Sequence, residues 1–214
     1  MYQKNKFAHD EYYHVFNKSI AGFKIFDNKS SIDRFLIALS YYNSPTATIT
    51  PLSSFLKKIK YYNVDVFSFR ENCLVKIIAY CIMPDHYHLL VKIIEEGIFS
   101  SYIGNVENSY VRYLNKKIDR KGPLWQSGFR SVKIEKNEQL LHVSRYIHLN
   151  PTTAQLVNKP QDWISSSYKN YLFPDFIKNF SEISINSPKK YQSFVEDQID
   201  YQKKLKLIKR KLLD

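Results

Sequence analysis

Cysteine, glycine and long apolar runs are all scarce in this sequence. Only 2 cysteines and 5 glycines occur among its 214 residues. Cys73 and Cys81 are too few for a disulfide framework and lack the clustered spacing of a zinc knuckle, which suits a reducing cytosol. No run of about 18 uncharged apolar residues occurs, and the start has no apolar leader segment. We therefore expect a soluble, cytoplasmic protein.

Acidic residues are few relative to basic ones. The chain has 32 Lys and Arg against 20 Asp and Glu, a formal net charge of +12. Such an excess attracts polyanions through counterion release and indicates a nucleic-acid partner. The alternative is a generally lysine-rich composition. Hydrophobic residues make up 44% and aromatic residues 15%, enough to bury the core of one globular domain, with or without an appendage.

β-branched and aromatic residues predict several strands. "YYHVFNKSI" and "CLVKIIAYCI" are the clearest, the second continuing beyond Pro84 as "HYHLLVKII", and "RSVKIE" and "VDVFSFR" are weaker candidates. Helical spacing predicts helices at 30–43, with Ser31 and Asp33 as cap residues, and at 98–118. A third helix should begin at Asn137 as its cap and stop at Pro151. This order predicts an α+β sandwich with an antiparallel sheet.

The composition changes after about residue 180. Tyr201, Leu205, Ile208 and Leu212 recur at helical spacing with lysines between them. We therefore divide the chain into a domain at 1–180 and a basic amphipathic helical extension at 181–214. The extension either docks on the domain with a solvated basic face or forms an arm that contacts DNA or a second copy.

Two histidines, separated by a single residue, occur in "YCIMPDHYHLLVK". In a strand, His86 and His88 would point to one face and could bind one divalent ion. The alternatives are surface histidines or hydrogen-bonded core histidines. A third group could come from the helix after Asn137, where Tyr146 and Asn150 share a face. His142 lies on the same face of that helix. It could be a metal ligand, a proton shuttle or an ordinary surface residue.

"YCIMPDHYHLLVK" and "RYIHLNP" together resemble the single-tyrosine HUH transposases, most closely the REP-associated tyrosine transposase branch. "YHVFNK", "GPLWQSGF" and "WISSSYKNY" also resemble blocks of that family in the same order, so the resemblance covers about residues 10 to 172. The sequence departs from the family pattern at four positions, Asp85, Lys18, Ser19 and Gly128. These departures put the DNA contacts near residues 18 and 128 in doubt, but they remove no candidate catalytic residue.

The resemblance implies a ferredoxin-like fold and a metal-dependent reaction on DNA. His86, His88 and the side-chain oxygen of Asn150 would hold Mg²⁺ or Mn²⁺, and Tyr146 would attack a scissile phosphate to give a 5′-phosphotyrosine. The substrate would be single-stranded DNA with hairpin or palindromic repeats, in a bacterial or archaeal cytoplasm. Family members occur as monomers and as homodimers, so both remain open.

Basic and aromatic residues near Trp125 are the candidate DNA contacts. Stacking on an aromatic ring combined with phosphate pairing is the usual way to hold a single strand. The candidates are Lys116, Lys117, Arg120, Lys121, Trp125, Arg130 and Arg145. Alternatively, Trp125 lies in the core and the basic residues near it are simply solvated. Arg145 could likewise form a salt bridge instead of contacting DNA.

Two other classes of function compete with a DNA strand transferase. One is a catalytically idle DNA-binding regulator derived from a transposase, and the other is a metal phosphodiesterase that forms no covalent intermediate. The joint presence of two histidines, a tyrosine and an asparagine favours the transferase. A trapped DNA adduct would separate it from both rivals.

Overall fold

Four described strands form one antiparallel sheet in this computed structural model, which describes residues 7–48, 50–60, 62–67, 72–177, 182–185 and 187–211. The strands are β1 (Tyr12–Lys18), β2 (Val75–Ile82), β3 (His86–Ile93) and β4 (Arg130–Ile134). Their order across the sheet is β2-β3-β1-β4. With helices between β1 and β2 and between β3 and β4, this is the predicted α+β, ferredoxin-like arrangement.

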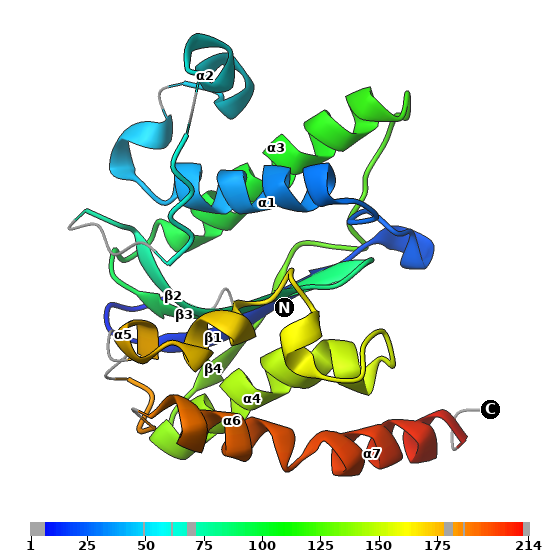
Figure 1. The fold of residues 1–214 in the computed structure, drawn as a ribbon. Helices are drawn as coiled ribbons and strands as arrows, with labels where there is room; N and C mark the ends of the chain where they lie inside the picture. Colours follow the sequence, from blue (N-terminus) through cyan, green and yellow to red (C-terminus); the bar gives the residue numbers. More distant parts are fainter. Residues whose placement is uncertain are drawn as a thin grey trace, which may run out of the picture.

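Helices cover both faces of this sheet (Figure 1). The helices are α1 (Lys29–Tyr42), α2 (Leu52–Lys58), α3 (Phe99–Lys117), α4 (Asn137–Thr153), α5 (Pro174–Ile177), α6 (Pro188–Glu196) and α7 (Ile199–Lys211). Short 3₁₀ turns lie at Ile20–Gly22, Pro45–Thr48, Pro160–Asp162 and Ser167–Leu172. Helices α1 and α3 pack together on one face, while α4, α6 and α7 lie on the other. Among the described residues no helix is both long and apolar enough to cross a bilayer.

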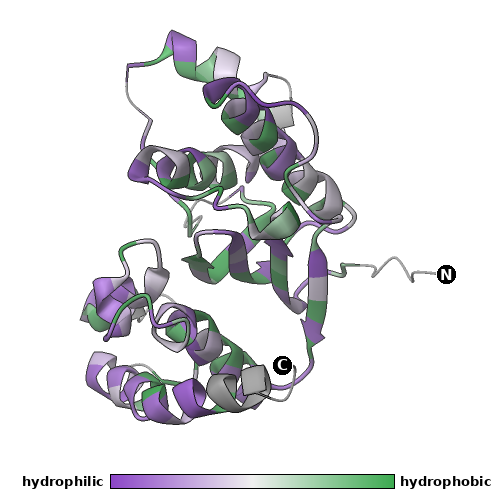
Figure 2. Cartoon of the chain, turned by 90° about the vertical axis from the view of Figure 1, so that its right-hand side faces the viewer, coloured by the Kyte–Doolittle hydropathy of each residue, from purple (hydrophilic) through white to green (hydrophobic). Residues whose placement is uncertain are grey.

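Strand β1 shows why the sheet has two different faces. Its residues alternate between half-buried and buried, as expected when side chains point to opposite faces in turn. Asn17 points toward α3, where its amide donates a hydrogen bond to Glu107 at 2.7 Å. His14 and Phe16 point toward the α4 face, where both rings pack near His88. Figure 2 shows apolar residues on the surfaces where helices and sheet meet.

Several predicted boundaries need correction. Strands β2 and β3 are separate and joined by a turn at Pro84, where the Met83 amide donates to the His86 carbonyl at 2.8 Å. Helix α1 is capped by Asn28, whose side chain accepts from the Ser31 amide at 3.0 Å; Ser31 and Asp33 themselves lie inside the helix. Of "VDVFSFR", residues 64–67 form no strand, and the rest lies outside the described residues.

Helix α4 differs from its prediction at both ends. Lys136 is its N-cap, and the Gln139 side chain accepts from the Lys136 amide at 3.3 Å. Pro151 lies inside the helix and does not stop it. Pro151 has no N–H to donate to the carbonyl four residues earlier, so α4 lacks one hydrogen bond there but still continues to Thr153. The Ala154 amide then closes that turn on the Asn150 carbonyl at 2.8 Å.

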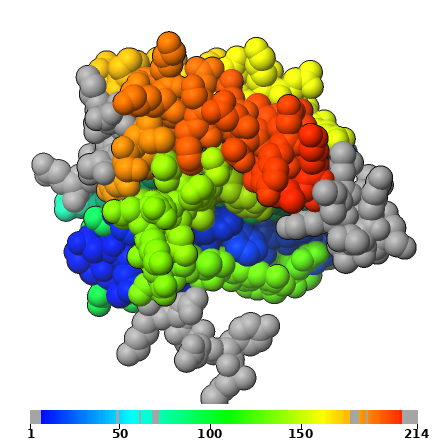
Figure 3. All heavy atoms as spheres, turned by 90° about the horizontal axis from the view of Figure 1, so that it is seen from below, coloured from blue at the N-terminus to red at the C-terminus, as the bar shows by residue number. Residues whose placement is uncertain are grey.

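The C-terminal segment consists of two helices, α6 and α7, that lie against α4 (Figure 3). Tyr191 of α6 is fully buried, and its hydroxyl donates to Ser144 of α4 at 3.0 Å. The segment is therefore docked on the domain, in agreement with one of the two predicted alternatives. On its predicted apolar stripe Tyr201 is 56% exposed, the side chain of Ile208 is not described, and Leu212 lies outside the described residues.

The α3 face of the sheet holds a buried carboxyl group. Glu107 is 7% exposed, and its Oε1 accepts hydrogen bonds from Asn17 at 2.7 Å and from the Tyr87 hydroxyl at 2.8 Å. Burial raises the pKa of Glu107 to about 7, although both hydrogen bonds oppose the shift. The folded protein therefore binds this proton more tightly than the unfolded chain, whose pKa is near 4.5.

We expect Glu107→Gln to remove a pH dependence of stability. The stabilisation from the protonated carboxyl is complete below pH 4.5 and is lost as the pH rises through about 7. Urea unfolding should show that the wild type, relative to the variant, loses up to about 3 kcal/mol between pH 4.5 and pH 8. The exposed Glu138→Gln is the control. An identical pH profile for wild type and Glu107→Gln would contradict the prediction.

Candidate functional site

The predicted histidines, tyrosine and asparagine line a single cavity. We call this space of about 280 Å³ between the sheet and α4 the histidine cavity. Its lining is Phe16, Asn17, Lys18, His86, His88, Gln126, Ser127, Arg130, Tyr146 and Asn150. Because side chains alternate along β3, both histidines face α4 while Tyr87 between them faces α3. All of these residues belong to one chain.

His88 is buried at the floor of the histidine cavity and held by a third histidine. It is 6% exposed, and its Nδ1 lies 2.9 Å from Nε2 of His14 on the neighbouring strand. Burial, and then the nearby His14 and His86, keep the pKa of His88 well below its usual range. Burial also lowers the pKa of His14 to about 4. Both rings are therefore neutral at pH 7, the form in which imidazole binds metals.

His86 is oriented by the acidic residue before it. Its Nδ1 lies 2.6 Å from Oδ1 of Asp85, and the other Asp85 oxygen lies 3.4 Å from Nζ of Lys18. Burial alone would raise the pKa of Asp85, but His86 and Lys18 outweigh it and hold the pKa below its ordinary value. Asp85 and Lys18 are two of the departures from the family pattern, and they contact each other here.

Tyr146 lies beside the histidine pair. Its ring meets the ring of His88 edge-on at 5.6 Å between centroids and that of His14 at 5.8 Å. The side chain is still 45% exposed, so its hydroxyl is accessible from the histidine cavity. Burial of the ring raises the pKa of Tyr146, and the Asn150 side chain only partly opposes this. The phenol is therefore protonated at neutral pH, and attack by it requires added positive charge or a base.

The donor atoms of the histidine cavity suit an open divalent site. Both imidazoles use Nδ1 for a hydrogen bond to a neighbour, which sets the ring orientation and makes Nε2 the metal-binding nitrogen. Asn150 donates its amide nitrogen to the Tyr146 carbonyl at 3.1 Å, so its oxygen is the atom suited to a cation. Within the described part of the chain, no group of three or more His, Cys, Asp and Glu could hold a metal, so a site here needs the asparagine.

Of the predicted DNA contacts, only Arg130 lines the histidine cavity. Lys116 lines a different cavity, Lys117 bonds to the start of α1, and Lys121 is exposed. Arg120 donates to the carbonyl of Pro123 at 2.8 Å and so closes a turn. These four basic residues therefore do not line the histidine cavity.

Arg145 and Trp125 have structural neighbours. The Arg145 guanidinium lies 4.3 Å from the ring centre of Phe194 in α6, so it packs on the C-terminal segment. Trp125 is 9% exposed and meets Tyr87 edge-on at 5.6 Å in the core below α3. No ring face of Trp125 is open to a base, and the core interpretation replaces the stacking platform.

Sequence reasoning missed His14, Lys18 and Gln126 as neighbours of the site. His14 and Lys18 stand in "YHVFNK", and strand alternation places them on the same face as Phe16. That face could have been assigned to the site only once β1 was known to pair with β3, where Phe16 lies opposite His88. Gln126 had no recognisable signal, because it reaches the site through a loop that bonds to Lys18.

A family model matches the part of the chain that carries the histidines and the tyrosine. Residues 56–150 match the model described as "Transposase IS200 like". The resemblance predicted from the sequence is thereby confirmed, and the segment includes His86, His88, Tyr146 and Asn150.

Two similar proteins point to one branch of these transposases. The chain is 28% identical over 108 residues to a "Putative REP-associated tyrosine transposase" of Haemophilus influenzae, a match that covers 46% of this chain and 61% of that protein. It also resembles the solved structure of a REP-associated tyrosine transposase bound to a REP hairpin, with a TM-score of 0.56 and 15% identity. That superposition covers 79% of this chain and 82% of the other and supports the common fold.

We expect the histidine cavity to bind Mn²⁺ in the absence of DNA. Calorimetric titration should show one site per chain, and His86→Ala or His88→Ala should weaken it by at least about 10-fold because each removes a ligand. Asp85→Ala should weaken it by about 10-fold to 100-fold, because the carboxylate orients His86. His142→Ala is the control, since His142 lies exposed beside Arg145. Equal Mn²⁺ affinity in all four variants would place the metal elsewhere.

Proposed function

We propose that this protein is a metal-dependent single-stranded DNA endonuclease and strand transferase that acts through a 5′-phosphotyrosine. One observation carries the proposal: the Tyr146 ring lies 5.6 Å from that of His88, in a cavity shared with His86 and Asn150. The family match over residues 56–150 supports the same class of enzyme. Residues 1–180 would be the catalytic unit, and residues 181–214 an extension that supports α4.

The proposed cleavage exchanges one phosphate ester for another. The Tyr146 oxygen forms a bond to phosphorus while the bond from phosphorus to the 3′ oxygen breaks. The phenol loses a proton, the leaving 3′ oxygen gains one, and the free 3′-hydroxyl can reverse the reaction on a new strand without ATP. A divalent ion held by His86, His88 and Asn150, Mg²⁺ or Mn²⁺, would stabilise the charge that develops on the phosphate.

Basic residues of the histidine cavity would position the DNA strand. Arg130 and Lys18 line it from neighbouring strands, and Arg130 can pair with a phosphate through two parallel hydrogen bonds. Lys18 is already engaged with Asp85, so it would contribute mainly charge. This positive charge would also favour the phenolate form of Tyr146, whose pKa is raised in the free protein.

The substrate we propose is a single strand that flanks a foldback hairpin. The related solved protein is bound to a REP hairpin, and the net charge of +12 here suits a nucleic-acid partner. The two rival functions predict different products. An idle DNA-binding regulator would bind without cleaving, and a non-covalent phosphodiesterase would cleave without an adduct. The chain contains a complete histidine and tyrosine set, so a monomer could act alone, and a homodimer remains compatible with it.

Tyr146→Phe should abolish covalent attachment of DNA and leave DNA binding nearly unchanged. The substitution removes only the phenolic oxygen and keeps the ring that packs on His88. The measurement is a denaturing gel of the protein with 5′-labelled and 3′-labelled hairpin strands in Mn²⁺. Tyr201→Phe is the matched control, because Tyr201 is 56% exposed on α7 and far along the chain from the histidine cavity. Adduct formation by Tyr146→Phe at the wild-type rate would move the nucleophile to another tyrosine.

Cleavage should require single-stranded DNA beside a hairpin, although binding should not. Phosphate contacts carry no sequence information, so duplex and single strands should both bind at low salt. A scissile phosphate must reach the Tyr146 hydroxyl in the correct orientation, however, and a stacked duplex strand resists the necessary bending. The experiment compares one hairpin-bearing strand, its annealed duplex and a hairpin-scrambled strand at matched salt. Equal cleavage of all three would favour a nonspecific nuclease.

A further inference from the structure

A second and larger cavity lies on the opposite face of the sheet from the histidine cavity. It has a volume of about 500 Å³ and is lined by residues of α1, α2 and α3, among them Arg34, Tyr42, Leu56, Arg112, Tyr113 and Lys116. We call it the arginine cavity. Helices α1, α2 and α3 lie on the side of the sheet away from α4 (Figure 1). A ligand here would therefore not compete directly with one at Tyr146.

A buried cation with no acidic partner among the described residues forms part of the wall of the arginine cavity. Arg34 is 9% exposed, and its NH1 atom is buried and has no hydrogen-bond partner. Its NH2 atom makes only a long contact of 3.4 Å to the Ser109 hydroxyl, and its guanidinium lies 5.5 Å from the ring centre of Tyr113. Burying a charge is costly unless it is paired, so an unsatisfied guanidinium beside an open cavity is suited to bind an anion.

The rest of the arginine cavity agrees with an anionic ligand. Arg112, Lys116 and Lys57 line it as exposed residues and so surround its mouth, while Arg34 lies deeper. None of the described residues that line it is acidic. Charge of one sign around a recess raises the local concentration of anions and draws them inward. The planar, forked guanidinium of arginine matches the oxygens of a phosphate.

The size and the apolar surface of the arginine cavity indicate a ligand larger than a phosphate ion. A cavity of about 500 Å³ is within the range of small-molecule sites, and it is larger than one phosphate group requires. Tyr42 and Tyr113 offer aromatic rings, and Leu52 and Leu56 add apolar surface from α2. A phosphate joined to a flat ring system combines both requirements. We propose that the arginine cavity binds a nucleotide, with its phosphate on Arg34 and its base against the tyrosine rings.

The bound nucleotide could be either a free mononucleotide or one nucleotide within a DNA strand. Thermal unfolding and calorimetry should be measured with inorganic phosphate, a 5′-deoxynucleotide, its nucleoside and a short single strand. The Tyr146→Phe chain serves as the parent, so that no result depends on cleavage. The nucleotide should bind at least about 10-fold more tightly than either the nucleoside or phosphate. If only the strand binds, and its affinity falls with the cavity variants, the source is DNA.

Arg34→Met is the main variant, because it keeps most of the side-chain volume and removes the buried charge. We expect its unliganded melting temperature to stay or rise, since replacing an unpaired buried ion by an apolar group is often stabilising. Its response to the nucleotide should be lost, and its affinity for the strand should fall below that of the parent chain. A lower melting temperature with an intact nucleotide response would make Arg34 a purely structural residue and overturn the proposal.

A pair of neighbouring lysines tests the site without touching the core. Lys57 lines the arginine cavity and Lys58 does not, although both are exposed on α2. Lys57→Gln combined with Arg112→Gln should weaken the nucleotide or the strand by at least about 10-fold, and Lys58→Gln should leave the affinity unchanged. Absence of binding by every probe, or equal binding to the parent and to both cavity variants, would overturn the proposal.

Discussion

The position of helix α4 on the sheet depends on one buried histidine. His148 is fully buried, with Nδ1 at 2.8 Å from the Tyr191 hydroxyl and Nε2 at 2.8 Å from the Ser167 hydroxyl. Burial lowers the pKa of His148 to about 3, so the ring stays neutral and keeps one donor and one acceptor. The Ser167 hydroxyl in turn accepts from the Tyr80 amide of β2 at 2.9 Å. The network thus joins α4 to α6 and to the sheet, two residues away from Tyr146.

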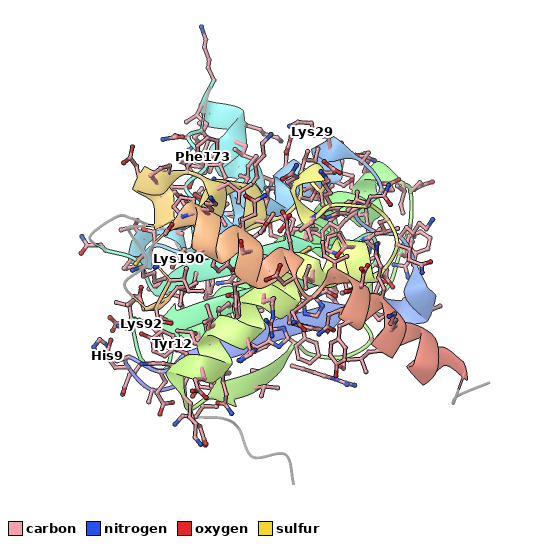
Figure 4. All side chains as sticks on the ribbon, turned by 60° about the horizontal axis from the view of Figure 1, so that its bottom comes forward. His9, Tyr12, Lys29, Lys92, Phe173 and Lys190 are labelled. Atoms are coloured by element: carbon pink, nitrogen blue, oxygen red, sulfur yellow. The ribbon has the colours of Figure 1, made fainter. Side chains whose placement is uncertain are left out.

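The same constraint gives the C-terminal segment a role in the site. Tyr191 bonds to both His148 and Ser144, and Arg145 packs on Phe194, so α6 supports the back of α4. Figure 4 shows α4 crossing the sheet with the C-terminal helices beside it. In this view Tyr12 and Lys92 lie near one end of α4. Lys92 lies 5.6 Å from the Tyr12 ring and bonds to Asp10, which closes that end of the sheet. The helix that carries Tyr146 is therefore held from behind by the contacts of α6.

Strand β3 serves two purposes because its side chains alternate. Tyr87 faces α3 and donates to the buried Glu107, which anchors the core on that side. His86 and His88 face α4, where they share the histidine cavity with Tyr146 and the ring of His88 meets the ring of Tyr146. The two faces also differ in how they manage charge. Asp85 and Lys18 pair beside the histidine cavity, whereas Arg34 on the other face is buried and has no carboxylate partner in the part of the chain that the structure describes. With Arg130 counted at the histidine cavity, the basic residues still outnumber the acidic ones at both cavities.

The sequence by itself indicated the segments of the four strands, without the turn that separates β2 from β3, as well as the helices at α1, α3 and α4 and the shared face of His86 and His88. These features depend on local spacing, since alternation in a strand and the turn of a helix place side chains without knowledge of distant segments. Other features of the site were decided only by the tertiary structure. Strand pairing brought His14 onto His88, core packing took Trp125 from the surface, and docking of α6 took Arg145 away from the site. The unpaired state of Arg34 also became visible only there, because whether a charge is satisfied depends on every segment around it.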